Sequence, residues 1–152
     1  MTLQLRTADE AETRAVGRRL AGLLRVGDVV LLAGGLGAGK TLFTGGMAEG
    51  LGVQGPVTSP TFVLLRRYDD GFLPVVHADA YRLGSLGELE DLDLFEEARD
   101  GVLVIEWGQA VADAMPSDHL VVHFEITGPS HRVLYLVPRG SWKERPLEEL
   151  AR

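Results

Sequence analysis

Residues 29–41, which read V-V-L-L-A-G-G-L-G-A-G-K-T, decide the fold of this chain. The first five form an apolar run typical of a buried strand, and residues 34–41 match the phosphate-binding pattern G-x-x-x-x-G-K-[ST]. Leu42, Phe43 and Met47 then continue at helical spacing, so the glycine-rich loop falls between a strand and a helix. This context predicts a nucleoside triphosphate site.

The residue types of the loop suit phosphate chemically. Glycines allow successive backbone N–H groups to surround an anion without a Cβ in the way, and the following helix directs its positive dipole end at the same anion. We expect Lys40 to reach the β- and γ-phosphates, and the Thr41 hydroxyl to bind a Mg²⁺ that bridges them. The alternative is a glycine-rich turn without a ligand, which the flanking strand and helix disfavour.

Length and composition indicate one domain over residues 1–152, because 45% hydrophobic content suffices for a core. The sequence has no apolar stretch of eighteen residues and no charged-then-apolar signal segment at its start. We therefore expect a soluble, cytoplasmic protein with no membrane partner. The absence of cysteine excludes disulfides, thiolate zinc sites and a cysteine nucleophile.

The net charge of −7 is concentrated between residues 88 and 100, where seven acids face a single arginine. This balance argues against direct binding of a nucleic acid backbone, which needs clustered Lys and Arg. The acidic run is either a solvated helical face or a docking surface for a basic partner. The chain has no asparagine, so the guanine-reading motif N-K-x-D cannot be present and ATP is the expected nucleotide.

The remaining patterns predict a three-layer α/β fold with a mixed sheet, parallel near the loop and antiparallel at an edge. A capping signature at Thr7 and Glu10 opens a first helix over residues 8–24, and the helix after the loop runs to about residue 50. Gly45 and Gly46 lie inside that second helix, where packing against the sheet is the expected compensation. Ser85 with Glu88 repeats the capping signature, and the further strands are expected at 61–68, 73–78, 102–105, 119–127 and 132–138.

A nucleotide-hydrolysing site also needs carboxylates, and in open α/β sheets ligands bind at the carboxyl ends of strands. Glu106 ends an apolar strand and is the first choice as a magnesium ligand; Asp79 ends another strand and is a candidate second metal-shell or water-orienting group, or else a turn cap. Thr61 could supply a hydroxyl that senses the γ-phosphate, and Trp107 could pack against nucleotide or in the core. The four histidines show no ligand-like clustering, although His119 and His123 share a strand face.

Four motifs follow one another along the chain: GGLGAGKT at 34–41, SPTF at 59–62, HADAYRL at 77–83 and IEW at 105–107. Together they resemble the TsaE (YjeE) family, the P-loop ATPases of bacterial tRNA threonylcarbamoyladenosine biosynthesis, and the resemblance covers nearly the whole chain. It implies a P-loop NTPase-like fold and an ATPase that acts within a complex, slowly when isolated. The implied partners resemble the TsaD threonylcarbamoyl-transferase and its TsaB companion, with tRNA contacted indirectly.

The resemblance also implies roles for individual residues. Lys40 and the loop amides would bind ATP, Thr41 and Glu106 would hold Mg²⁺, and Thr61 would belong to a switch-like segment. Asp79 and Trp107 match positions associated with activity. The complete nucleotide-binding set is Thr13, Gly35, Leu36, Gly37, Ala38, Gly39, Lys40, Thr41, Leu42, Trp107 and Arg132. This chain departs from the family at Gly35, where Asp is frequent, and at Leu42, where Thr is frequent.

Two other functions fit the same loop. A small-metabolite kinase would need an acceptor pocket, for which Arg66, Arg67 and Arg82 are possible anion clamps. A nucleotide-gated binding module would hardly hydrolyse ATP, and its partner assembly would survive Glu106→Ala.

Overall fold

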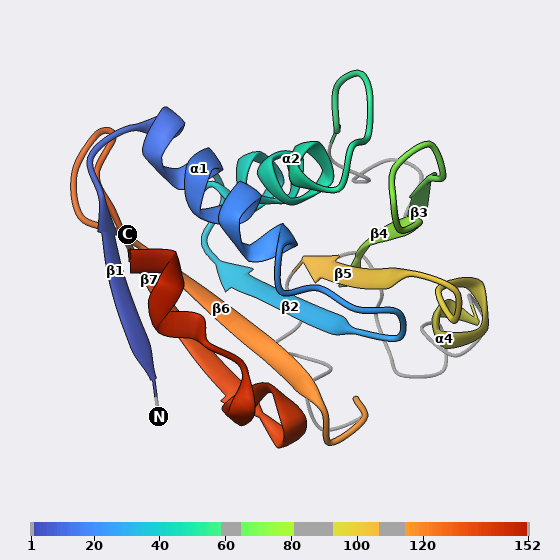
Figure 1. The fold of residues 1–152 in the computed structure, drawn as a ribbon. Coiled ribbons are helices and arrows are strands. Elements are labelled where there is room, and N and C mark those ends of the chain that lie inside the picture. The colour runs from blue at the N-terminus through green and yellow to red at the C-terminus, as the bar shows by residue number, and fades with distance from the viewer. Residues whose placement is uncertain (1, 59–64, 81–92, 107–114, 152) are drawn as a thin grey trace.

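The computed structural model describes residues 2–58, 65–80, 93–106 and 115–151. The strands in these ranges form one seven-stranded sheet of order β1-β7-β6-β2-β5-β4-β3 (Figure 1). The strands are β1 Leu3–Thr7, β2 Val29–Gly34, β3 Leu65–Tyr68, β4 Val75–Asp79, β5 Val102–Glu106, β6 His119–Ile126 and β7 Arg132–Arg139. The helices are α1 Glu10–Ala21, α2 Lys40–Gly50, α4 Leu94–Glu97, and the 3-10 helices η3 Gly140–Glu144 and η4 Leu147–Ala151.

The sheet is parallel at its centre and antiparallel on both sides. Strands β6, β2, β5 and β4 pair in parallel, whereas β7 and β1 continue the sheet antiparallel at one edge and β3 does so at the other. The predicted mixed sheet and its two antiparallel pairs, β3 with β4 and β6 with β7, are confirmed. The prediction of antiparallel pairing at a single edge was incomplete.

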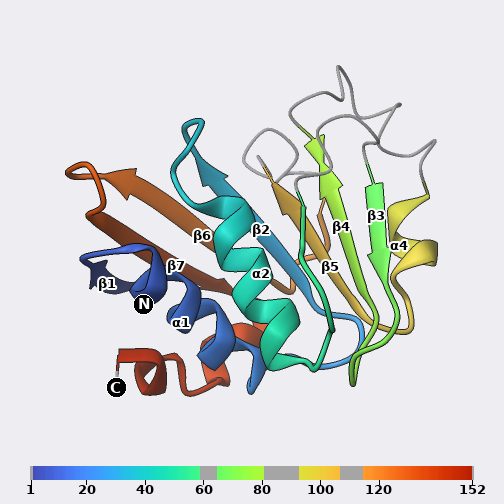
Figure 2. The same ribbon diagram turned by 90° about the horizontal axis from the view of Figure 1, so that it is seen from above.

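Helices cover both faces of the sheet, which gives the predicted three layers. Figure 2 shows α1 and α2 side by side over one face. On the other face, Leu94 of α4 packs with Val76, Leu103 and Ile105 from the central strands. Side chains of a strand alternate between the two faces, and because both faces are covered, β2, β4 and β5 are buried along most or all of their length.

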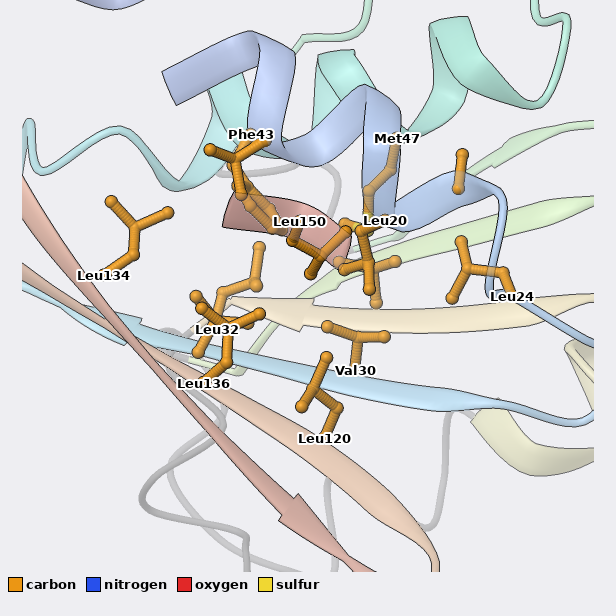
Figure 3. Packing of buried hydrophobic residues seen from close by; sticks show 14 of the residues in the cluster. Leu20, Leu24, Val30, Leu32, Phe43, Met47, Leu120, Leu134, Leu136 and Leu150 are labelled. Carbon is orange, nitrogen blue, oxygen red and sulfur yellow. The ribbon is translucent and has the colours of Figure 1, made fainter. Parts of the chain in front are cut away.

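The larger core lies between the sheet and the helices α1 and α2 (Figure 3). Leu20 of α1 and Phe43 and Met47 of α2 are almost fully buried above Val30 and Leu32 of β2. These residues recur at helical spacing on α1 and α2 and at every second position on β2, so each element presents one apolar side to this core. The glycine-rich loop therefore joins two elements, β2 and α2, that both contribute to this larger core.

Helices α1 and α2 approach each other through glycine. A Cβ at Gly46 would lie 3.0 Å from the carbonyl carbon of Arg14 and 3.1 Å from the backbone nitrogen of Arg18, both on α1. Arg14 and Arg18 in turn pair with Glu49 of α2 at 2.9 Å each. The expectation that Gly46 is compensated by packing on the sheet was wrong, because the close contact is with the neighbouring helix.

The ends of α1 also differ from the sequence prediction. Asp9, and not Thr7, caps the helix: its side chain accepts from the Glu12 backbone N–H at 2.8 Å, and the Glu12 carboxylate accepts from the Ala8 N–H at 2.7 Å. Thr7 instead ends β1, an edge strand that the sequence analysis missed together with η3 and η4. The expected strand residues 61–64 and the capping signature of Ser85 and Glu88 lie outside the described residues.

Candidate nucleotide site

The candidate site lies at the carboxyl ends of the neighbouring strands β2, β5 and β4 (Figure 2). Asp79 is the register partner of Glu106 on the neighbouring parallel strand, and Glu106 is also opposite Leu32 of β2. Because side chains alternate along a strand, His77 and Asp79 share a face with Val75, which packs in the core below α1 and α2. Glu106 shares that face in β5. The sheet therefore brings two predicted acids together beneath the start of α2.

Glycine shapes the loop between β2 and α2. A Cβ at Gly34 would lie 3.0 Å from Phe124 of β6. Glycine at this position therefore allows the backbone at the end of β2 to pass close to β6. Gly39 directly precedes the first helical residue. Its φ of 107° is a backbone conformation that residues with a side chain rarely adopt. At Gly35, by contrast, a Cβ would meet nothing within 4 Å, so the structure leaves room for the Asp that the family often has.

Lys40, the first residue of α2, folds back across the loop. Its Nζ donates to the carbonyl oxygens of Gly34 at 2.6 Å and of Gly35 at 3.1 Å. Burial lowers the pKa of the Lys40 ammonium below its ordinary value, while the carboxylates of Glu106 and Asp79 act in the opposite direction. The lysine is thus a buried cation close to two acids, in the position from which it could meet a polyphosphate.

Thr41 and Glu106 meet as the sequence analysis expected of two ligands of one metal. The Thr41 hydroxyl donates to Glu106 Oε1 at 3.0 Å, although the two residues are 65 positions apart. A hydroxyl and a carboxylate are the hard oxygen donors that Mg²⁺ prefers, so this pair fits the ion. Within the described ranges, no three His, Asp or Glu side chains form a metal cage.

His77 joins the site although the sequence analysis assigned it no role. It is fully buried in β4, and its Nε2 lies 2.8 Å from Glu106 Oε2. The signal was present in the sequence, because His77 precedes Asp79 by two residues and so shares its face of the strand. Only the pairing of β4 with β5 reveals that this face contains Glu106.

Arg132 and Thr13 support the loop from its sides. The Arg132 guanidinium donates from Nε to Ala38 O at 3.1 Å and from Nη2 to Gly37 O at 3.2 Å. Thr13 is buried, bonds the Thr7 hydroxyl at 2.7 Å, and its Cγ2 would lie 3.5 Å from a Cβ at Gly39. Both residues therefore lie beside the glycine-rich loop, and their contact with a nucleotide stays a prediction.

The remaining residues proposed from the sequence make no contact that bears on nucleotide binding within the described part of the chain. Thr61, Trp107 and Arg82 lie outside the described residues. Leu36 is fully exposed at the tip of the loop, and Leu42 lies in the first turn of α2. Arg67, considered above as an anion clamp for a kinase, pairs with Asp69 at 2.6 Å and with Asp100 at 3.0 Å.

Comparisons with known proteins agree on one family. The family model described as "Threonylcarbamoyl adenosine biosynthesis protein TsaE" matches residues 7–134. The chain is 56% identical over 111 residues to the "tRNA threonylcarbamoyladenosine biosynthesis protein TsaE" of Streptomyces coelicolor, covering 70% of this chain and 74% of that protein. It is 40% identical over 151 residues to the protein of the same name from Bacillus subtilis, covering 99% and 94%. The crystal structure of Bacillus subtilis YdiB matches with a TM-score of 0.80 at 34% identity, covering 100% of this chain and 95% of that one.

Proposed function

The chain belongs to the TsaE family, whose members act in tRNA threonylcarbamoyladenosine biosynthesis, and we propose that it is the subunit that binds and hydrolyses ATP there. The product of the complex would be N6-threonylcarbamoyladenosine at position 37 of tRNAs that read ANN codons. One observation supports the ATPase role best. Lys40 bonds the glycine-rich loop, and the next residue, Thr41, bonds Glu106 at the end of β5. Residues 1–152 would act as one domain.

In this proposal each residue has a distinct task. The loop amides from Gly35 to Thr41 would surround the phosphates, and Lys40, which now donates to two loop carbonyls, would donate to phosphate oxygens instead. Thr41 and Glu106 would hold Mg²⁺, which when bound neutralises charge on the β- and γ-phosphates. Asp79 is the register partner of Glu106 on the next strand, and it would orient a water molecule or complete the outer shell of the metal site.

Partner subunits complete the proposal. A TsaD-like transferase and a TsaB-like companion would perform the chemistry on tRNA, and this chain would touch tRNA only through them. The charge of −7 supports this division, because phosphate backbones are bound by clustered Lys and Arg. We place the complex in the cytoplasm. Among the described residues, no helix is both long and apolar enough to span a membrane.

ATP turnover with and without the partner subunits tests the proposal. We expect slow hydrolysis by the isolated chain and faster hydrolysis in the complex, since a group supplied by a partner can raise such rates by about 10³–10⁵. Lys40→Ala should weaken ATP binding by about 10-fold or more, the loss expected for a charge-assisted hydrogen bond. Glu106→Ala should retain nucleotide and stall turnover. Equal and rapid hydrolysis with and without partners would contradict the proposal.

The two alternatives predict different outcomes in the same assays. A nucleotide-gated binding module that carries the Glu106→Ala substitution would still assemble with its partners in the presence of ATP. A metabolite kinase would transfer phosphate to an acceptor other than water, which screening with labelled ATP would detect. The ion pairs of Arg67 make the kinase the weaker alternative, because that guanidinium already binds two carboxylates.

A further inference from the structure

One buried histidine of the site lies beyond the reach of a phosphate. His77 is 0% exposed, and it lies on β4 two residues before the strand ends at Asp79. A side chain without any exposed surface cannot bind a ligand that arrives from solvent. Its interaction with Glu106, which itself is 5% exposed, is therefore the route by which it can affect the reaction.

The two oxygens of the Glu106 carboxylate have different partners. Oε1 accepts from the Thr41 hydroxyl at 3.0 Å, and Oε2 lies 2.8 Å from His77 Nε2. An ionised carboxylate can only accept hydrogen bonds, so we assign the hydrogen of this bond to His77 Nε2. Within the described residues Nδ1 has no hydrogen-bond partner, which also suits the tautomer in which it carries no hydrogen.

This arrangement fixes the direction of the carboxylate. A glutamate side chain has three rotatable bonds, and one hydrogen bond to Thr41 would leave it free to turn about that contact. The second bond, from a ring buried in the neighbouring strand β4, holds Oε2 against His77 and so leaves Oε1 with Thr41 at the start of α2. Partners behind metal ligands commonly act in this way, and their loss lowers metal affinity by about 10–100-fold.

We propose that His77 is a positioning residue that orients Glu106 for Mg²⁺ through its Nε2–H group. The inference rests on the proposed function, because it presupposes that Glu106 and Thr41 hold the metal. It assigns to His77 no contact with ATP and no proton transfer. The alternative is that His77 only fills space in the core, in which case its hydrogen-bonding atoms would be irrelevant.

Two amide substitutions separate positioning from packing. His77→Gln can place an N–H group near the position of Nε2, whereas the shorter side chain of His77→Asn places its N–H group near Nδ1 and cannot reach Glu106. Both variants bury a neutral amide at the same site, so they control for each other. His77→Leu, which fills the volume without a donor, replaces His77→Asn if that variant does not fold.

The measurement is equilibrium binding of a fluorescent ATP analogue during a Mg²⁺ titration, repeated in EDTA, with thermal unfolding of each ligand-free variant. We expect His77→Asn to raise the half-saturating Mg²⁺ concentration by about 10-fold or more and to leave the affinity in EDTA unchanged. For His77→Gln, the half-saturating Mg²⁺ concentration and the affinity in EDTA should each remain within about threefold of the values for the unmodified protein. ATP turnover should follow the Mg²⁺ titration.

The outcomes distinguish this inference from the proposed function. If both variants change Mg²⁺ dependence equally, or if neither does, His77 has no positioning role, although the ATPase proposal stands. If Mg²⁺ dependence changes only in proportion to the unfolding temperature, His77 is a packing residue. If the unmodified chain binds the analogue without any effect of Mg²⁺, or does not bind it, the proposed function fails and the inference fails with it.

Discussion

Replacing Gly46 with Ala would introduce a methyl group into the tightest contact between α1 and α2. The added Cβ would lie 3.0 Å from the Arg14 carbonyl carbon, 3.1 Å from the Arg18 nitrogen, and closer still to the Arg14 carbonyl oxygen. These are backbone atoms of α1, so no side-chain rotation can relieve the overlap. Gly45 provides a matched control, because a Cβ there would lie 3.6 Å from the Arg14 guanidinium, which is ordinary contact.

The magnitudes follow from two opposing effects. Either substitution gains about 1 kcal/mol from the higher helix propensity of Ala. Overpacking costs about 1–3 kcal/mol, and Gly46→Ala belongs at the upper end because backbone must move. We therefore expect Gly46→Ala to lower the free energy of unfolding by about 1–2 kcal/mol and Gly45→Ala to raise it by about 1 kcal/mol.

Urea and thermal unfolding of the two variants test this reasoning. A difference of about 2–3 kcal/mol corresponds to a gap of about 5–10 °C in Tm for a chain of this size. ATP affinity provides a second readout, since a displaced α2 carries Lys40 and Thr41 with it. Equal stability of the two variants, or a more stable Gly46→Ala, would refute the steric argument.

Three further predictions concern charged side chains. Asp28→Asn should lower the free energy of unfolding by about 3–5 kcal/mol in a urea titration, because it leaves the buried Arg145 guanidinium without its anion; a loss below about 1 kcal/mol would contradict this. The hydrogen bond from Arg14 lowers the pKa of Glu49, so its contribution to stability is present above the ordinary carboxylate pKa and is lost as pH falls through the lowered one. Glu49→Gln should therefore be less stable than the unmodified protein at neutral pH, and the difference in urea midpoint should shrink as pH falls below the ordinary carboxylate pKa. Arg132→Lys should weaken ATP binding by about 10-fold with little change in Tm, because one ammonium group cannot bond both loop carbonyls; unchanged affinity would show that the loop holds its shape without them.

Much of the fold and one half of the site could be predicted from local sequence. Residues 29–41 contain a strand, a glycine-rich loop and a helix start in immediate succession, so sequence spacing alone places Lys40 and Thr41. The apolar runs in β4 and β5 likewise mark Asp79 and Glu106 as strand-end acids. The short edge strand β1 could not be predicted in this way, because its local sequence signal is weak and the strand depends on its pairing with β7.

The sequence by itself therefore determined the phosphate-binding loop and the acids that could serve it, because each depends on contacts between near neighbours in the chain. Only the tertiary structure decided which of these groups meet. The bond between Thr41 and Glu106 and that between His77 and Glu106 join β4, β5 and α2 across 65 and 29 positions. Such contacts depend on strand order and register, and these are set by how the whole sheet buries its apolar faces.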